Sequence, residues 1–471
     1  MNKSKLTTGP IFKNLLRFSL PMIMISILQM LFHTMDTAVL GIMATDAEVA
    51  AVGACGSLIS MLLCLVTGYS SAANVLISRR IGAGDEKGAR RAVGVALVMG
   101  LLSGVILMVV VLTFSRHFLI MTNCQPEVLD MAVLYINIYF IGMPVMMLYN
   151  FIASILRAGG DSVRPMIYMI ISGVVNVGLN FLFVIVFNMT VSGVAAATVI
   201  SNLVSLILGI IALAKEKEYC KIEWRNLRIF REEFLEMIGI GLPSCLAGLS
   251  FYFGEVVVVS AVNSISTDAM TANTISSQLD RLNYTVGESI ASATGVMISQ
   301  SFGAKNFERV KKTFNVGMLY CVSVVMLIGV IVVLLSDPLI GIFTKSETVV
   351  ALTKERLILV CLTNFVTCAM NVLTNALRAL KRQHWVLIVG LICGFMIRSF
   401  WAWFAWPLVG TVSFLFICLP LSTLVGSIIC FFVYKNASKK ELKAPDTQVP
   451  ESQKLSIGSE SLRIGSNMKK K

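Results

Sequence analysis

Charged side chains are scarce in this sequence. Asp, Glu, Lys and Arg make up only 14% of the 471 residues. Hydrophobic residues account for 56%, and the mean hydropathy of +0.82 lies far above the range of soluble globular proteins. Histidine is rarer still: His33, His117 and His384 are isolated, with no HExxH motif or clustered nucleophile and base. The sequence therefore indicates a polytopic membrane protein, and we expect neither an enzyme nor a bound cofactor.

Metal-ligand and disulfide patterns are missing as well. The 11 cysteines are scattered singly through apolar segments, so we interpret them as small hydrophobic residues. The net charge of +13 comes from Lys and Arg in the loops between apolar segments, where membrane topology accounts for them. We therefore expect no nucleic-acid partner.

What the sequence has in abundance is long apolar runs. A helix that crosses a bilayer needs about 20 apolar residues, and runs of that length or longer alternate here with short charged or Gly/Pro segments. This pattern predicts an all-α protein of twelve spans, six in each half. The predicted spans are 14–40, 47–78, 89–114, 127–155, 163–187 and 190–214, then 236–264, 269–300, 307–335, 347–379, 384–407 and 409–434.

The two halves repeat each other at an offset of 221 residues. Arg157 aligns with Arg378 and Asn150 with Asn371, and near the start the offset is 222. Duplicated bundles are typical of secondary transporters, with the substrate path between the halves. An even number of spans per half makes the two repeats parallel. The predicted domains are an N-terminal lobe (1–214), a cytoplasmic linker (215–235), a C-terminal lobe (236–434) and a disordered cytoplasmic tail (435–471).

Basic residues favour one side of the membrane. The loops that follow even-numbered spans are rich in Lys and Arg, as at Arg90 and Arg91, whereas the other loops contain few, with Arg116 and Lys345 as the main exceptions. By the positive-inside rule both termini are cytoplasmic. We expect a multi-pass protein of the cell (inner or plasma) membrane that contacts lipid and acts as a monomer.

Several polar residues lie within the predicted N-terminal spans. Placing an ionisable group at the bilayer centre costs about 3 kcal/mol. The presence of Asp36 in span 1 therefore indicates a structural or functional role. Asn176 and Asn180 share one face of span 5, and Thr198 lies in span 6. Together they supply oxygens suited to a proton or to sodium, in which case Asp36 is a metal ligand. The alternatives are that Asp36 sits at a water-exposed helix end and that the amides and Thr198 only join helices.

Ionisable residues also occur in the C-terminal spans. Glu255 in span 7 aligns with His33 and is a second candidate for cation coupling, and Glu288 in span 8 is another intramembrane acid. Asp280 and Arg281 are adjacent in span 8, and Arg398 lies in span 11. For these three residues we expect structural ion pairing or cavity lining.

A substrate cavity is predicted two helical turns deeper than Asp36. Gln29 and Met169 precede Asp36 and Asn176 by seven residues each and lie on the same helix faces. The predicted substrate-binding residues are therefore Gln29, Asp36, Met169, Asn176 and Glu255.

Several segments together resemble the prokaryotic multidrug and toxic compound extrusion family, over residues 11–434. They include Ser19-Leu20-Pro21, Met35 to Gly41, Gly82 to Asp85, Leu156 to Asp161 and Gly303 to Asn306. The resemblance implies a V-shaped twelve-helix transporter that exchanges protons or sodium for exported organic compounds. It also implies a cation site at Asp36, Asn176, Asn180 and Thr198, although this sequence has Asn180 and Asn371 where family members have acids.

Two other functions compete with drug export. A flippase for lipid-linked oligosaccharides or other lipids would share the fold, but its cavity would be expected to carry several arginines for phosphate. Few basic residues occur inside the spans, mainly Arg281 and Arg398. A channel fits the paired half-bundles less well than alternating access does. We therefore expect small organic cations or other amphipathic compounds as the transported partners.

Overall fold

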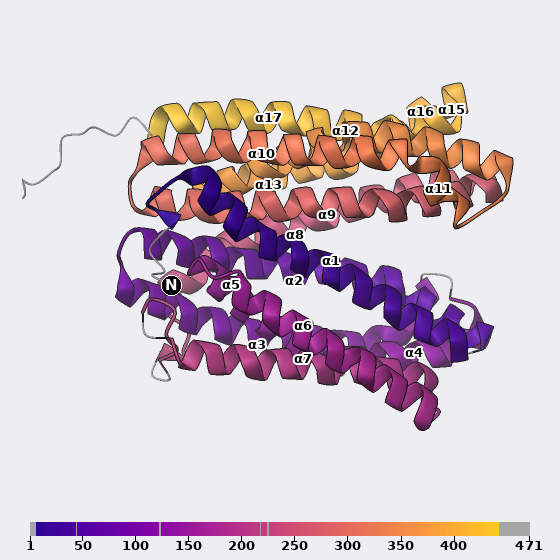
Figure 1. The fold of residues 1–471 in the computed structure, drawn as a ribbon, viewed down its shortest axis with the longest axis horizontal. Coiled ribbons are helices and arrows are strands. Elements are labelled where there is room, and N and C mark those ends of the chain that lie inside the picture. The colour runs from indigo at the N-terminus through magenta and orange to yellow at the C-terminus, as the bar shows by residue number, and fades with distance from the viewer. Residues whose placement is uncertain (1–5, 44, 122–123, 217, 224–225, 442–471) are drawn as a thin grey trace, which may run out of the picture.

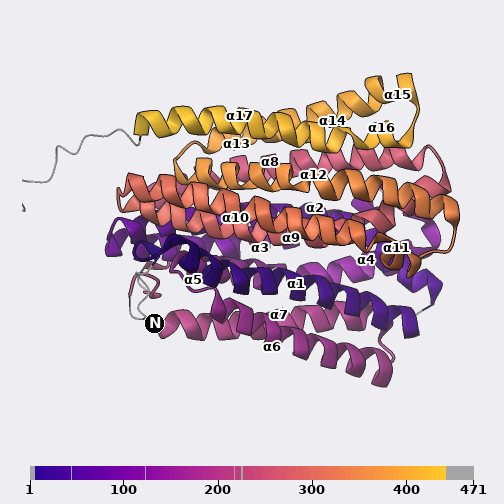
Figure 2. The same ribbon diagram turned by 45° about the horizontal axis from the view of Figure 1, so that its top comes forward.

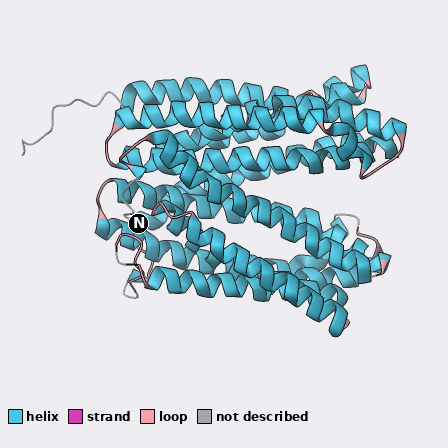
Figure 3. Ribbon diagram, in the orientation of Figure 1, coloured by secondary structure: helices cyan, strands magenta, loops and turns pink. Residues whose placement is uncertain are grey.

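The protein is built from helices that cross the full height of one bundle. The computed structural model describes residues 6–441 except 44, 122–123, 217 and 224–225, and this part of the chain contains no strand (Figure 3). Within it, 10 helices are long and apolar enough to cross a membrane, or 11 if one pair bent by 45° counts as a single span. A further helix of 37 residues, Thr267–Gly303, is more polar and is absent from that set. These helices correspond to the twelve predicted spans.

The N-terminal half contains six spans. They are α1 (Ile11–Met43), α2 (Asp46–Gly82), α3 (Glu86–Met121), the bent pair α4 (Pro126–Ile141) and α5 (Met143–Ala158), α6 (Val163–Asn180) continued by the π-helical η2 (Phe181–Val186), and α7 (Thr190–Ala214). The predicted boundaries agree to within a few residues at most ends.

The C-terminal half has the same order with more breaks. It comprises α8 (Arg231–Asn263), α9 (Thr267–Gly303), α10 (Phe307–Leu334), the short α11 (Ser336–Gly341), α12 (Glu347–Ala379), a span made of α13 (Gln383–Val389), η4 (Gly390–Met396), α14 (Ile397–Phe400), η5 (Trp401–Ala405) and α15 (Trp406–Val409), and then α16 (Val412–Phe416) and α17 (Cys418–Glu441).

The backbone confirms the internal repeat. Left-handed residues recur at the offsets seen in the sequence, although glycine is replaced by other residues at several of these positions. The matched pairs, with their φ angles, are Gly84 (70°) and Lys305 (53°), Gly160 (83°) and Lys381 (60°), and Asn188 (53°) and Gly410 (74°). The same turn thus closes equivalent helices in both halves.

The two halves form two layers (Figure 1), and in the view turned by 45° α9 and α10 of the C-terminal half lie in front of α2 and α3 (Figure 2). Helices α2 and α8 pack against each other, and α9 contacts both α1 and α2 of the other half. Helix α1 crosses between the layers. Its first turns, with Leu15 and Phe18, pack on Val296 and Met297 of α9, whereas its later turns lie against α6. The start of α1 and the end of α17 lie at the same end of the bundle (Figure 1).

Several helices extend beyond the predicted boundaries. Helix α8 begins at Arg231 rather than at residue 236, because Glu232 and Glu233 in its first turn suit the positive end of the helix dipole. Helix α17 continues past Lys435 to Glu441, since Tyr434 and Ala437 are buried and two lysines occupy its last turn. The rest of the predicted tail lies outside the described residues.

Candidate functional site

A hydrogen-bonded chain of three side chains joins α1 to α6. The Asn180 amide donates to the Asp36 carboxylate over 2.5 Å and lies 3.3 Å from the Asn176 carbonyl oxygen, to which it also donates. Asn180 is fully buried, and Asn176 is 6% exposed. The structure therefore brings together three of the predicted coupling residues.

A glycine explains why these helices approach so closely. A Cβ atom on Gly173 of α6 would lie 1.8 Å from the ring of Phe32 in α1, so only glycine leaves room for that ring. Asp36 follows Phe32 by four residues and Asn176 follows Gly173 by three, which places both one turn further along the contact. The packing of Phe32 on Gly173 thus sets the distance between the carboxylate and the amides.

The oxygens of this site are of the kind that a cation would need. The side-chain oxygen of Asn180 is buried and has no hydrogen-bond partner within the described part of the chain. A buried polar atom without a partner is unfavourable, and carboxylate and amide oxygens are the ligands that hard cations prefer. Asp36 and Asn180 therefore fit a sodium ion, and Asp36 alone fits a proton.

The other predicted residues are arranged differently. The Thr198 hydroxyl donates to the carbonyl of Val194 in its own helix over 3.0 Å, so it is not part of the hydrogen-bonded chain. Gln29 is exposed, and Met169 is half-buried against the N-terminal hydrophobic core. The side chain of His33 lies outside the described residues.

Two tyrosines at this site were missed from the sequence. Tyr135 and Tyr139 of α4 are buried within electrostatic range of Asp36. Their spacing of four residues inside an apolar span places both on one helix face, and that signal was available in the sequence.

Glu255, the predicted coupling acid of the C-terminal half, forms an ion pair with Arg398. Arg398 donates to Glu255 over 2.8 Å, contacts the Ser422 hydroxyl at 3.3 Å and lies over the ring of Phe251. Arg398 is 8% exposed, whereas the Glu255 side chain is 43% exposed, so the arginine is withdrawn from water and the acid is not. Glu255 is therefore a poorer site for a mobile cation than Asp36, because its charge is already balanced.

A second buried polar cluster lies beside this pair. Asp280 accepts from Asn364 over 3.2 Å, and Arg356 donates to Ser276 over 2.7 Å. Ion pairing was expected for Asp280, Arg281 and Arg398. Asp280 and Arg281 do not pair with each other, whereas Arg398 pairs with Glu255.

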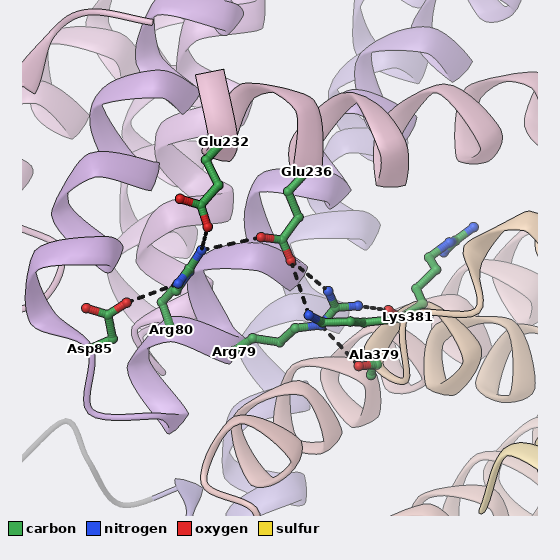
Figure 4. Close-up of polar contacts among 8 residues, drawn as sticks. Arg79, Arg80, Asp85, Glu232, Glu236, Ala379 and Lys381 are labelled. Atoms are coloured by element: carbon green, nitrogen blue, oxygen red, sulfur yellow. Dashed lines mark hydrogen bonds and ion pairs between the residues drawn. The ribbon is translucent and has the colours of Figure 1, made fainter. Parts of the chain in front are cut away.

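At the end of the bundle where α1 begins and α17 ends, Arg79 joins the two halves (Figure 4). Its Nε donates to the carbonyl of Ala379 over 3.0 Å, a second nitrogen donates to the carbonyl of Arg378, and a third lies 3.4 Å from Glu236. Arg79 is 6% exposed. One buried side chain from α2 thus holds the end of α12 and the start of α8.

Neighbouring charges extend this contact. Arg80 reaches Asp85 at 3.1 Å, Glu236 at 3.5 Å and Glu232 at 3.7 Å, and Lys381 lies 4.0 Å from Glu236 (Figure 4). The acids come from α8 and the α2–α3 turn, and the basic residues from α2 and the turn after α12, so the network couples four segments.

The contact made by Arg79 has a symmetric counterpart. Gln300 of α9, the repeat equivalent of Arg79, donates over 2.7 Å to the carbonyl of Ala158, the repeat equivalent of Ala379. The bond of Arg79 to Ala379 and the bond of Gln300 to Ala158 are therefore equivalent, one donated by each half to the other. We call these two bonds the reciprocal latch.

Matched glycines allow the latch to form. A Cβ on Gly82 would lie 1.9 Å from the carbonyl oxygen of Gln300, and a Cβ on Gly303 would lie 2.1 Å from that of Arg79. The ends of α2 and α9 therefore touch backbone to backbone at two equivalent points.

The described residues contain no group of three or more His, Cys, Asp or Glu side chains that could hold a metal.

A family model, MatE, matches the sequence twice, over residues 21–182 and 243–404, which is more than half of the chain. The chain belongs to the MatE family. It is a transporter rather than an enzyme, and a multi-pass membrane protein.

Relatives of this MatE-family chain carry names that refer to drug export. The probable multidrug resistance protein YpnP of Bacillus subtilis is 25% identical over 93% of this chain and 98% of its own length. Another B. subtilis protein, the probable multidrug resistance protein YoeA, is also 25% identical, over 81% of this chain and 84% of its own length. The multidrug export protein MepA of Staphylococcus aureus is 23% identical over 73% of this chain and 76% of its own length.

Solved structures share the fold. A MATE structure described as being in the bent conformation has a TM-score of 0.87 at 21% identity and covers 94% of this chain and 100% of its own. An outward-facing multidrug resistance MATE transporter has a TM-score of 0.86 at the same identity, over 94% of this chain and 99% of its own. These likenesses confirm the V-shaped bundle of two repeats.

Proposed function

We propose that this protein exports organic compounds, mainly cations, from the cell by antiport with protons or sodium. The observation that carries the proposal is the chain Asp36–Asn180–Asn176, in which one carboxylate is the only ionisable group and a buried amide oxygen lacks a partner among the described residues. The names of the relatives, which refer to multidrug resistance and export, support the substrate class.

Competition at Asp36 supplies the coupling. A proton or sodium ion bound at Asp36 neutralises the charge that attracts a cationic substrate, so each ligand weakens binding of the other. Entry of the ion from outside then favours release of the substrate there. Because Asn180 replaces an acid, Asp36 alone carries the exchangeable charge in this half.

Alternating access supplies the movement. The reciprocal latch joins the halves at the end that we assign to the cytoplasm, where the basic loops lie, α1 begins and α17 ends. Opening toward the cytoplasm requires the bonds of Arg79 and Gln300 to break, and their symmetry suits a rocking of two parallel repeats. We propose that one chain is the working unit.

Ethidium accumulation in everted vesicles tests this function, with proton or sodium gradients imposed separately. The wild type should accumulate ethidium under one gradient, and Asp36→Asn should abolish that uptake. Asp130→Asn is the matched control, because Asp130 pairs with Arg116 at an exposed position. Uptake that survives Asp36→Asn but is lost in Glu255→Gln would move coupling to the C-terminal half. If neither gradient drives uptake, the lipid-flippase alternative becomes the better one.

A further inference from the structure

The polarity of α9 sets it apart from the other long helices. It has 37 residues, yet it is absent from the set that is apolar enough to span a membrane. Its exposed residues explain this, because most of them are polar and recur every three or four positions. From the outer end inward, after Thr267 and Asp268 in the first turn, the exposed polar residues are Thr271, Thr274, Gln278, Arg281, Tyr284 and Glu288. We call this set the α9 polar face.

This face ends abruptly at Glu288. From Ser289 to Ser301 no residue of α9 is exposed. Glu288 lies near the middle of the helix, and the next residue, Ser289, contacts Ser26 of α1 at 3.1 Å. The polar face is thus accessible along the outer half of α9 and closed at mid-depth, where the two halves meet.

Lipid is an unsuitable neighbour for this face. An arginine or acid in the bilayer centre costs about 3 kcal/mol. Helix α9 also packs against α1 and α2 of the N-terminal half and against α10 and α12 of its own half. The exposed charges of α9 are therefore best satisfied by water and solutes between the halves.

The charges on the α9 polar face are available to a ligand. Arg281 is exposed and makes no hydrogen bond or ion pair with any residue that the structure describes. Tyr284 and Arg378 both lie within electrostatic range of Glu288, and Glu288 forms no ion pair within the described chain. Tyr284 itself is 36% exposed.

The repeat shows that these charges are specific to one half. At the offset of 221, Arg281 corresponds to Ser60 and Glu288 to Thr67, both neutral. The basic and acidic groups of this face are therefore additions to the duplicated framework rather than parts of it.

We propose that Arg281 and Glu288, with Tyr284 between them, form a binding site for zwitterionic amphiphiles. The inference rests on the proposed export function and deepens it by naming a substrate class. Seven residues of helix separate the two charges by about 10 Å along the axis. Glu288 and the ring of Tyr284 bind the cationic part of the substrate at mid-depth, and the Arg281 guanidinium binds a carboxylate nearer the outside.

A matched pair of dyes tests the site. Rhodamine 110 carries a carboxylate and a delocalised cation, whereas rhodamine 123 is its methyl ester and carries only the cation. Uptake of each is measured in everted vesicles under the driving gradient. Arg281→Gln should raise the KM for rhodamine 110 roughly tenfold, since hydrogen bonds between charged groups are strong, and leave the KM for rhodamine 123 unchanged. Glu288→Gln should impair both dyes.

Two further variants separate recognition from folding. Arg281→Lys retains the charge and should restore most rhodamine 110 uptake. Lys345→Gln removes an exposed positive charge from the α11–α12 loop and should change neither dye. Arg281→Gln could change the KM for both dyes equally or change neither, and either result would overturn the inference. Uptake of rhodamine 123 by the same vesicles would still support the export function. Failure of the wild type to transport either dye would overturn both.

Discussion

Breaking one bond of the reciprocal latch should open, by a measurable amount, the end of the bundle that we propose to be cytoplasmic. Gln300→Leu keeps the approximate size of the side chain and removes its donor to Ala158. The Ala158 carbonyl is then left without that partner at a buried position, which costs about 1–3 kcal/mol. Because the bond exists only when the two ends touch, the cost falls on the cytoplasm-closed state alone. The closed-to-open ratio should fall by about 5- to 150-fold.

The population shift can be measured as a distance. Spin labels at Lys87 and Lys311, which are exposed at the starts of α3 and α10, report the separation of the halves by double electron–electron resonance. Within the described chain nine cysteines are buried, so replacing Cys64 and Cys124 leaves few competing sites for the label. Gln300→Leu should add a longer distance to the distribution.

Controls decide whether the latch is responsible. Gln278→Leu makes the same change in the same helix, at an exposed position away from the latch, and should leave the distances unchanged. Arg79→Leu should shift the distribution further than Gln300→Leu, because it removes two bonds from a charged group and the contact with Glu236. A folded Gln300→Leu protein with the wild-type distribution would refute the reasoning.

Close contacts elsewhere in the bundle give three more tests. Gly173→Leu should abolish ion-driven uptake, because the leucine side chain displaces Phe32. The added change Phe32→Ala should restore part of the uptake, and failure of this rescue would contradict the proposed packing of the site. Glu255→Gln should lower the thermal unfolding temperature by leaving the buried guanidinium of Arg398 unpaired, and adding Arg398→Met should recover much of the loss; additive effects would argue against the pair. Gly303→Val should hold the cytoplasmic end open in the same distance measurement, because a Cβ there would lie 2.1 Å from the carbonyl oxygen of Arg79, and an unchanged distribution would contradict this.

Patterns along the chain were enough to predict the architecture. Hydrophobic run length predicts the spans because a bilayer imposes one length on every helix that crosses it. The 221-residue repeat predicts two equivalent halves, and the left-handed turns at matched positions confirm it. The joining of Asp36 to Asn176 and Asn180 was also predictable, since an acid and two amides inside apolar spans need polar partners.

Which partners the other polar residues find depends on how the helices pack in three dimensions. The pairing of Glu255 with Arg398 joins residues 143 positions apart, and the bond of Gln300 to Ala158 joins residues 142 apart. Helical periodicity specifies the face on which a residue lies but not the helix that packs against that face. Thr198 turned to its own backbone and α9 exposed its polar face between the halves, because crossing geometry and the small residues at each contact, rather than local sequence, set which side chains meet.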